Sequence, residues 1–191
     1  IDIIQPAVKY TTEGAIDGDL AAEIKSKIEL GDDYGMIKAS QIGKEWYQQI
    51  AALEDWMKGK TVDEVLALPV MQKDDAHPAV PTDPDLTSSV TVSVEGYQAV
   101  VKEAWENKID VTGATAVGIG MQASVAKSKA LENDVAQAQF DIPMAVVAID
   151  KDGKVVGAVI DNAQARIQFD AEGKFVEAPT GEAKTKNDLG A

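Results

Sequence analysis

The sequence predicts an α+β protein, an antiparallel sheet of hairpins packed on one face by helices. Two observations lead to this prediction. Short segments of strand character follow one another between residues 115 and 170, with turns between them. Outside that region, residues 42–57 and 95–107 place apolar side chains at helical spacing.

The expected strands run from 115 to 170. After a first strand at 115–125, residues 144–150 are apolar and rich in β-branched side chains, and the turn Asp150–Gly153 leads into a strand at 154–160. Residues 165–170 alternate apolar and polar side chains, as a half-buried strand does. The turn at 150–153 lacks the ligand spacing of an EF-hand loop, so we expect a hairpin there and no metal.

The expected helices have recognisable ends. The first ends in a basic, glycine-containing stretch, and Thr61 and Glu64 then form a capping box that opens a short helix to Leu68. Ser93 is the expected N-cap of the helix at 95–107. The proline-rich residues 69–85 predict an extended, poorly ordered connection. We expect two apolar stripes to be packed core: Ile42, Trp46, Ile50, Leu53 and Met57, and Tyr97, Val101, Ala104 and Trp105.

Composition excludes several functions. The 191 residues carry a formal net charge of −14, which repels phosphate backbones, so no nucleic-acid partner is expected. Cysteine is absent, which removes thiolate chemistry and fits an exported protein from an organism that avoids disulfides. The single histidine, His77, lies in a loop, which disfavours a catalytic dyad or triad within the chain. No apolar run is long enough for a transmembrane segment.

The end of the chain repeats its beginning. Residues 160–190 align with residues 1–31 without gaps, at an offset of 159 residues. The period is domain-sized, so we interpret the repeat as serial copies of one module. A duplication inside one domain is the alternative. Identical pairs include Ile160–Asp161 with Ile1–Asp2, Glu172–Gly173 with Glu13–Gly14, and Leu189–Gly190 with Leu30–Gly31.

This interpretation defines the domain organisation. Residues 1–100 are the C-terminal part of one copy, and residues 101–191 are the N-terminal part of the next, with 160–191 repeating 1–32. The chain is then a window of a longer protein, and neighbouring copies are its expected partners. The repeats compete for one position: either 1–30 completes the sheet begun by 144–159, within the chain or in a strand-swapped homo-oligomer, or it packs as an extra layer.

The order of elements suggests a family. Strands around an Asp-Gly-Lys turn, then helices, then a polar run headed by Asp and an amphipathic helix resemble the FMN-binding domains of extracytoplasmic ion-pump subunits and of related bacterial surface lipoproteins. In that family a run D-x-x-(S/T)-G-A-(S/T) holds the flavin. Its last Ser or Thr can be esterified to the FMN phosphate, so the resemblance makes FMN the candidate cofactor.

Two stretches are similar to this run. The stretch at 110–115 contains T-G-A-T, but it has one residue too few after the Asp and leads into an expected strand. The stretch at 85–91 directly precedes a helix, but Ser88 and Ser89 replace Gly-Ala, and Val90 replaces the acceptor. Small residues let backbone N–H groups approach a phosphate, and hydroxyls add donors. An ordinary turn or N-cap is the alternative. The candidate cofactor-binding residues are Asp110, Thr112, Gly113, Ala114, Thr115, Asp85, Thr87, Ser88 and Ser89.

The stretch Gly31–Lys38 mixes glycine, acids and an aromatic residue just before the first helix. We interpret it as a lead-in whose acids complement the helix dipole, with a ligand loop as the alternative.

Together these observations predict a non-catalytic repeat module of a bacterial surface lipoprotein or cell-envelope protein. It is expected outside the cytoplasm, with any lipid anchor beyond these residues, and it binds a flavin or another small ligand. The alternative is a structural or adhesive spacer that binds no ligand. A hydrolase is not supported, because no nucleophile–base pair or suitably placed pair of carboxylates is evident.

Overall fold

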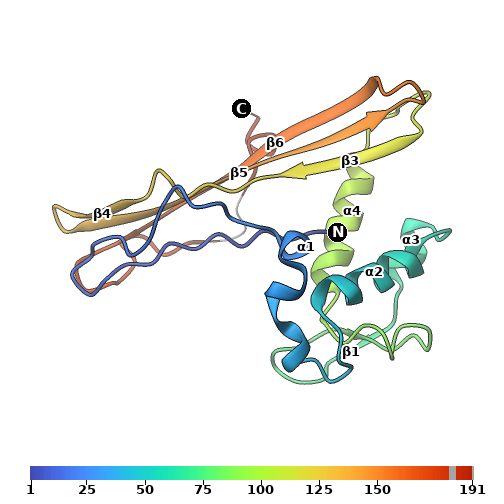
Figure 1. Cartoon of the computed structure of the whole chain (residues 1–191), viewed down its shortest axis with the longest axis horizontal. Coiled ribbons are helices and arrows are strands. Elements are labelled where there is room, and N and C mark those ends of the chain that lie inside the picture. The colour runs from blue at the N-terminus through green and yellow to red at the C-terminus, as the bar shows by residue number, and fades with distance from the viewer. Residues whose placement is uncertain (181–183, 191) are drawn as a thin grey trace. The chain divides into compact units, whose positions relative to one another are not determined.

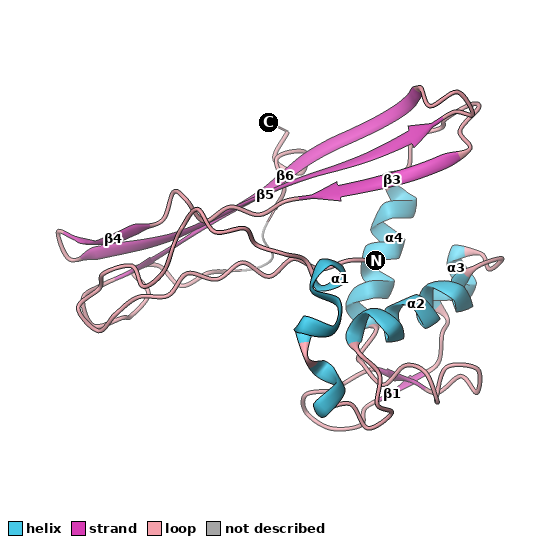
Figure 2. Cartoon of the chain, in the orientation of Figure 1, coloured by secondary structure: helices cyan, strands magenta, loops and turns pink. Residues whose placement is uncertain are grey.

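The structure is a computed structural model that describes residues 1–180 and 184–190. The chain divides into two compact units. The helical unit consists of residues 1–3 and 26–110, and the sheet unit consists of residues 4–25 and 111–191. Figure 2 shows that all the labelled helices belong to the first and the long strands to the second. The α+β class is therefore confirmed, and the helices build a core of their own.

The elements of the helical unit are short. They are α1 (Lys27–Leu30), η1 (Gly31–Tyr34), η2 (Met36–Lys38), α2 (Trp46–Met57), α3 (Val62–Leu66), β1 (Val70–Met71), β2 (Val80–Pro81) and α4 (Glu95–Glu106).

The core of the helical unit forms around α2. Three members of the expected apolar stripe, Trp46, Ile50 and Leu53, are buried, and Met57 is partly buried against them. The helix begins at Trp46 and not at Ile42, so Ile42 lies outside it. The three buried residues pack with Leu68, Leu86, Val90 and Val94. The corresponding prediction for α4 is wrong for Trp105, which is 53% exposed, and this helix has no fully buried residue. Tyr97 of the same stripe is partly buried against the core.

One buried carboxylate stabilises the loop before α2. Glu45 is only 2% exposed, and its two oxygens accept the N–H groups of Met36 and Ile37, each at 2.8 Å. These hydrogen bonds satisfy the N-terminus of η2 and compensate for burying the charge. The stretch Gly31–Lys38 is thus a structured lead-in of two 3-10 turns.

Two local predictions have opposite outcomes. The capping box of α3 is present as expected, with Thr61 and Glu64 bonding each other's backbone N–H groups. Ser93, however, does not cap α4: the N-cap is Val94, and the hydroxyl of Ser93 accepts the N–H of Ala79 instead. The proline-rich connection is also better ordered than expected, because β1 and β2 pair within it.

The sheet unit is dominated by one long hairpin (Figure 1). Its strands are β3 (Ala116–Met121), β4 (Lys129–Glu132), β5 (Val135–Ile149) and β6 (Val155–Phe169). Strand β5 pairs antiparallel with each of the other three. The turn at Asp150–Gly153 is confirmed, with Gly153 at φ 78°. The two strands expected at 154–160 and 165–170 are one continuous strand, β6.

Strand β4 was not expected from the sequence. It joins β5 through Asn133 and Asp134, which both adopt positive φ, at 50° and 63°. Such a pair suits the two-residue turn of a hairpin, because its twist matches that of the flanking strands.

The sequence repeats have different surroundings. Residues 160–169 lie in β6 and pair with β5, so this copy continues the sheet begun by 144–159. The N-terminal copy contains no regular strand, although Tyr10 and Ile16 form a bridge. It is tied to β4 by a 2.8 Å hydrogen bond from the N–H of Leu131 to the carbonyl of Gly14.

Among the described residues, no helix combines the length and the apolar character that crossing a membrane requires.

Candidate functional site

Equivalent aromatic residues of the two repeats meet in the sheet unit. Tyr10 and Phe169 correspond at the repeat offset, and their ring centroids lie 6.3 Å apart at an interplanar angle of 57°. Phe175 extends this pair, with its ring centroid 5.3 Å from that of Phe169. Tilted arrangements at such distances are favourable for aromatic rings.

Each ring is followed by a turn of the same construction. In the first, Oγ1 of Thr11 accepts the N–H groups of Glu13 and Ala15 at 3.3 and 3.2 Å. In the second, Oδ1 of Asp170 accepts those of Glu172 and Lys174 at 3.0 and 2.8 Å. Both turns contain a glycine at φ 77°, Gly14 and Gly173, which a side-chain-bearing residue adopts only at a cost.

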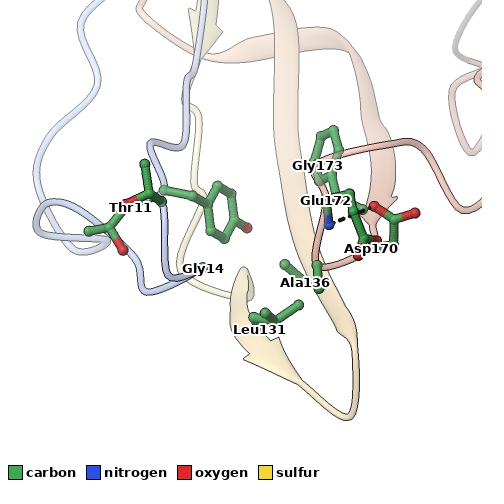
Figure 3. A pocket seen from close by; sticks show the side chains of 11 residues that line it. Thr11, Gly14, Leu131, Ala136, Asp170, Glu172 and Gly173 are labelled. Atoms are coloured by element: carbon green, nitrogen blue, oxygen red, sulfur yellow. Dashed lines mark hydrogen bonds between the residues drawn. The ribbon is translucent and has the colours of Figure 1, made fainter.

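A cavity of about 370 Å³ lies between the two turns. Figure 3 shows Thr11 and Gly14 on one side and Asp170, Glu172 and Gly173 on the other, with Leu131 and Ala136 between them. The rings of Tyr10 and Phe169 complete the wall. The volume lies within the usual range for small-molecule sites.

Tyr10 supplies an unused polar group in this cavity wall. Its hydroxyl oxygen is buried and has no hydrogen-bond partner among the described residues. Burial also raises the pKa of Tyr10, so the group is an uncharged donor at neutral pH. An unpaired buried hydroxyl is costly, and a ligand acceptor that reaches it after a small displacement of the cavity wall would remove that cost.

The charge at the cavity favours some ligands over others. Asp170 and Glu172 lie in its wall, and none of the described lysines or the arginine lines it. A phosphate or carboxylate would be repelled, whereas a neutral or cationic planar molecule could stack on the aromatic rings.

The sheet unit has a second polar feature, a ladder of side chains along β5 and β6. The guanidinium of Arg166, the chain's single arginine, donates from Nε to Oε1 of Gln139 at 3.1 Å. Gln139 in turn donates to Asp141, which also pairs with Lys127 at 3.3 Å. Sequence reasoning missed this ladder. The signal was the alternation of polar residues at Gln137, Gln139 and Asp141 and at Gln164, Arg166 and Gln168.

The stretch at 85–89 forms a turn in the helical unit. The carbonyl of Asp83 accepts the N–H groups of Leu86 and Thr87, and the carbonyl of Leu86 accepts those of Ser89 and Val90. These donors are therefore already used within the turn. The hydroxyl of Thr87 is likewise bonded, to the carbonyl of Pro84 at 3.3 Å.

The acceptor position of this stretch is Thr91 and not Val90. Counted from Asp85, the last hydroxyl residue of the family pattern falls on Thr91, and Val90 falls on the alanine. Thr91 is tied to the buried Gln49, whose Oε1 accepts its N–H at 2.8 Å and its hydroxyl at 3.3 Å. Val90 is part of the core.

The stretch at 110–115 lies at the boundary of the units, with Asp110 closing the helical unit and Val111 opening the sheet unit. Thr112, Gly113, Ala114 and Thr115 are exposed, and Gly113 has φ 80°. Both the N–H and the hydroxyl of Thr115 donate to the carbonyl of Ile149, at 2.8 and 3.2 Å. A flavin phosphate at Thr115 remains a prediction.

The cavity and Thr115 are separate sites. Phe169 pairs with Ala136 at one end of β5, whereas Thr115 binds the carbonyl of Ile149 at its other end. Ala136 and Ile149 are thirteen steps apart along the extended strand, which is about 43 Å at about 3.3 Å per residue. One flavin cannot reach both.

Among the described residues, no three or more His, Asp or Glu side chains cluster in a way that could hold a metal ion. Nδ1 of His77 lies 2.7 Å from Asp74, and both are exposed in the proline-rich connection.

Comparisons with known proteins give one short similarity. No family model matches the chain, and no solved structure matches it significantly. A chlorophenol reductase of Desulfitobacterium hafniense is 49% identical to the chain over 41 residues. This similarity covers 22% of the chain and 12% of the reductase, so the chain spans only a small part of that protein's length.

Proposed function

We propose that the chain is a non-catalytic, extracytoplasmic module of a bacterial cell-envelope protein. It binds a small, planar, uncharged or cationic ligand between the turns at 11–14 and 170–173. The observation that carries this proposal is the hydroxyl of Tyr10, which is buried behind the wall of an aromatic cavity and has no hydrogen-bond partner in the described part of the chain. The location rests on the absence of cysteine and on the resemblance to FMN-binding domains.

The ligand follows from the wall of the cavity. The rings of Tyr10 and Phe169 offer stacking surfaces, and the hydroxyl of Tyr10 offers one hydrogen bond. Asp170 and Glu172 disfavour an anionic group. A flavin ring without its phosphate meets all three conditions. A neutral chlorophenol meets them too, and the short similarity to a chlorophenol reductase makes this the second probe.

The test compares riboflavin with FMN in a fluorescence titration of the full chain. We expect riboflavin to bind more tightly than FMN, because only FMN brings a phosphate to the acidic cavity. Tyr10→Phe should weaken riboflavin binding about tenfold, the value of one hydrogen bond of about 1.4 kcal/mol. Tyr47→Phe is the matched control, because the hydroxyl of Tyr47 donates to Asp32 in the helical unit. This substitution should leave the affinity for riboflavin unchanged.

The other outcomes are also informative. A strong preference for FMN over riboflavin, abolished by Thr115→Ala, would contradict the cavity as the ligand-binding site. It would instead favour a phosphate-binding site at 110–115. If riboflavin, FMN and 4-chlorophenol all fail to bind, the ligand proposal fails and the spacer alternative remains. Proteolysis of the chain on intact cells of its host would test the extracytoplasmic location.

A further inference from the structure

The C-terminal repeat contains a second copy of the surface on which the helical unit is built. We define the first seat as residues 1–3 and 26–31, which belong to the helical unit. The second seat is the equivalent set, residues 160–162 and 185–190, in the sheet unit. The two seats have equivalent backbone hydrogen bonds, but the residues that cover them differ.

An aspartate organises each seat. In the first, Oδ1 of Asp2 accepts the N–H groups of Ile3 and Ile28 at 2.7 and 3.1 Å. In the second, Oδ1 of Asp161 accepts those of Asn162 and Asn187, also at 2.7 and 3.1 Å.

A backbone hydrogen bond beside each aspartate joins the two parts of the seat. The N–H of Lys27 donates to the carbonyl of Ile3 at 2.8 Å, and the N–H of Lys186 donates to that of Asn162 at 3.0 Å.

Each seat then starts a helical turn with a reciprocal cap. Ser26 and Glu29 bond each other's backbone N–H groups, at 3.2 and 2.7 Å. Thr185 and Asp188 do the same, at 3.3 and 2.9 Å. This arrangement is the capping box of a helix N-terminus.

The first seat is covered by the rest of its unit. Ile1 and Ile3 pack against the core around Trp46, and Ser26 is only 2% exposed. The ammonium group of Lys27 lies 4.8 Å from the ring of Tyr34 and 5.2 Å from that of Trp46, within the range of cation–π contacts.

The residues of the second seat are more exposed. Ile160, the counterpart of Ile1, is 72% exposed, and Leu189, the counterpart of Leu30, is 65% exposed. Lys186, the counterpart of Lys27, is exposed as well. Asn162 replaces Ile3, and its buried Oδ1 has no partner among the described residues. Ile1, the counterpart of Ile160, packs against a core in the first seat, so Ile160 presents an equivalent apolar side chain that is not covered in this way.

We propose that the second seat is the docking surface for another helical body of the kind formed by residues 32–110. Its occupant presents an apolar core to Ile160 and an aromatic pair, equivalent to Tyr34 and Trp46, to the ammonium group of Lys186. This inference is independent of any small ligand, because it rests on the hydrogen bonds that the two seats share.

The test extends the full chain, after Gly190, with a second copy of residues 32–110. All three tryptophans of the chain, Trp46, Trp56 and Trp105, lie in this segment, so tryptophan fluorescence reports on helical bodies alone. We expect the fluorescence change on denaturant unfolding to double relative to the unextended chain. The amides of Lys186 and Asn187 should gain protection from hydrogen exchange.

Substitutions in each seat supply the control. In the extended chain, Ile160→Ser with Asp161→Ala should return the unfolding amplitude to that of one body. Exchange protection of β5 amides would confirm that the sheet remains folded. The matched pair Ile1→Ser with Asp2→Ala should destabilise only the first body. The proposal is overturned if the added body stays unfolded on the intact second seat, or if it folds equally well on the substituted one.

Discussion

Gly14 and Leu131 approach each other so closely that a Cβ built on Gly14 would lie 2.4 Å from the Cβ of Leu131. The N–H of Leu131 also donates to the carbonyl of Gly14. This contact attaches the N-terminal repeat to β4. Its counterpart in the other repeat, Gly173, has the same φ, but no atom lies within 4 Å of the position that a Cβ would occupy.

The two glycines therefore form a matched pair for mutation. Gly14→Ala combines backbone strain at positive φ with steric overlap, and should destabilise the sheet unit by about 2–4 kcal/mol. Gly173→Ala introduces only the backbone strain and should destabilise the sheet unit by about 1–2 kcal/mol. Exchange of β5 amides under mild denaturant would measure both. Equal effects would contradict the close contact with Leu131.

Glu45 should be the most sensitive acidic residue of the helical unit. Glu45→Gln replaces one carboxylate oxygen by an NH2 group, which cannot accept the N–H of Met36 or Ile37. The expected loss is about 2–3 kcal/mol, because a charged acceptor is lost and a buried donor is left unpaired. Tryptophan-detected unfolding would show it. Glu106→Gln, on the exposed surface of α4, should shift the same transition by no more than about 0.5 kcal/mol.

The two aspartates of the seats should behave differently in the unextended chain. Asp2→Ala removes two hydrogen bonds within the helical unit and should lower its stability by about 1–2 kcal/mol. Asp161→Ala removes the same bonds in the sheet unit, so the tryptophan transition should not move. A common shift would show that Asp161 also supports the helical unit.

Acid should weaken the sheet unit through Asp141. Burial raises the pKa of this carboxyl group, but hydrogen bonds from Gln164, Lys127 and Gln139 outweigh burial, and the net pKa is lowered. A carboxyl group with a lowered folded-state pKa stabilises the fold above its unfolded pKa of about 3.9. That stabilisation is lost as the pH falls from there through the lower folded value.

Carboxyl NMR of the folded chain would give the pKa of Asp141 directly. Asp141→Asn should flatten the pH dependence of sheet stability between about pH 4 and the folded pKa. An unchanged acid limb in this variant would contradict the assignment to Asp141.

Local signals in the sequence predicted local structure well. The turn ending at Gly153 and the capping box of Thr61 each depend on residues within a few positions of one another. The local sequence was therefore sufficient to predict them. Trp105 shows where this reasoning ends: its helical spacing with Tyr97 fitted a buried stripe, yet α4 has too little around it to bury the ring. Periodicity indicates which side chains share a face, and not what covers that face.

The candidate site was beyond local reasoning. Nothing near Tyr10 indicates that its ring meets that of Phe169, which is 159 residues away. The repeat did reveal that the two residues are equivalent. Equivalence did not reveal proximity, because two similar segments need not contact each other through the same residue. Glu45 was missed for another reason: a glutamate next to Lys44 is expected to be solvated unless its backbone partners are known.

The two repeats preserve bonding roles where they do not preserve residue types. Thr11 and Asp170 are both side-chain acceptors, Ser26 and Thr185 are both hydroxyl caps, and Glu29 and Asp188 are both carboxylates. A search for further copies in related genomes should therefore score what a side chain can accept or donate, at fixed spacing, and ignore its name. The template comprises seven positions: Asp2, Tyr10, Thr11, Gly14, Ser26, Glu29 and Gly31.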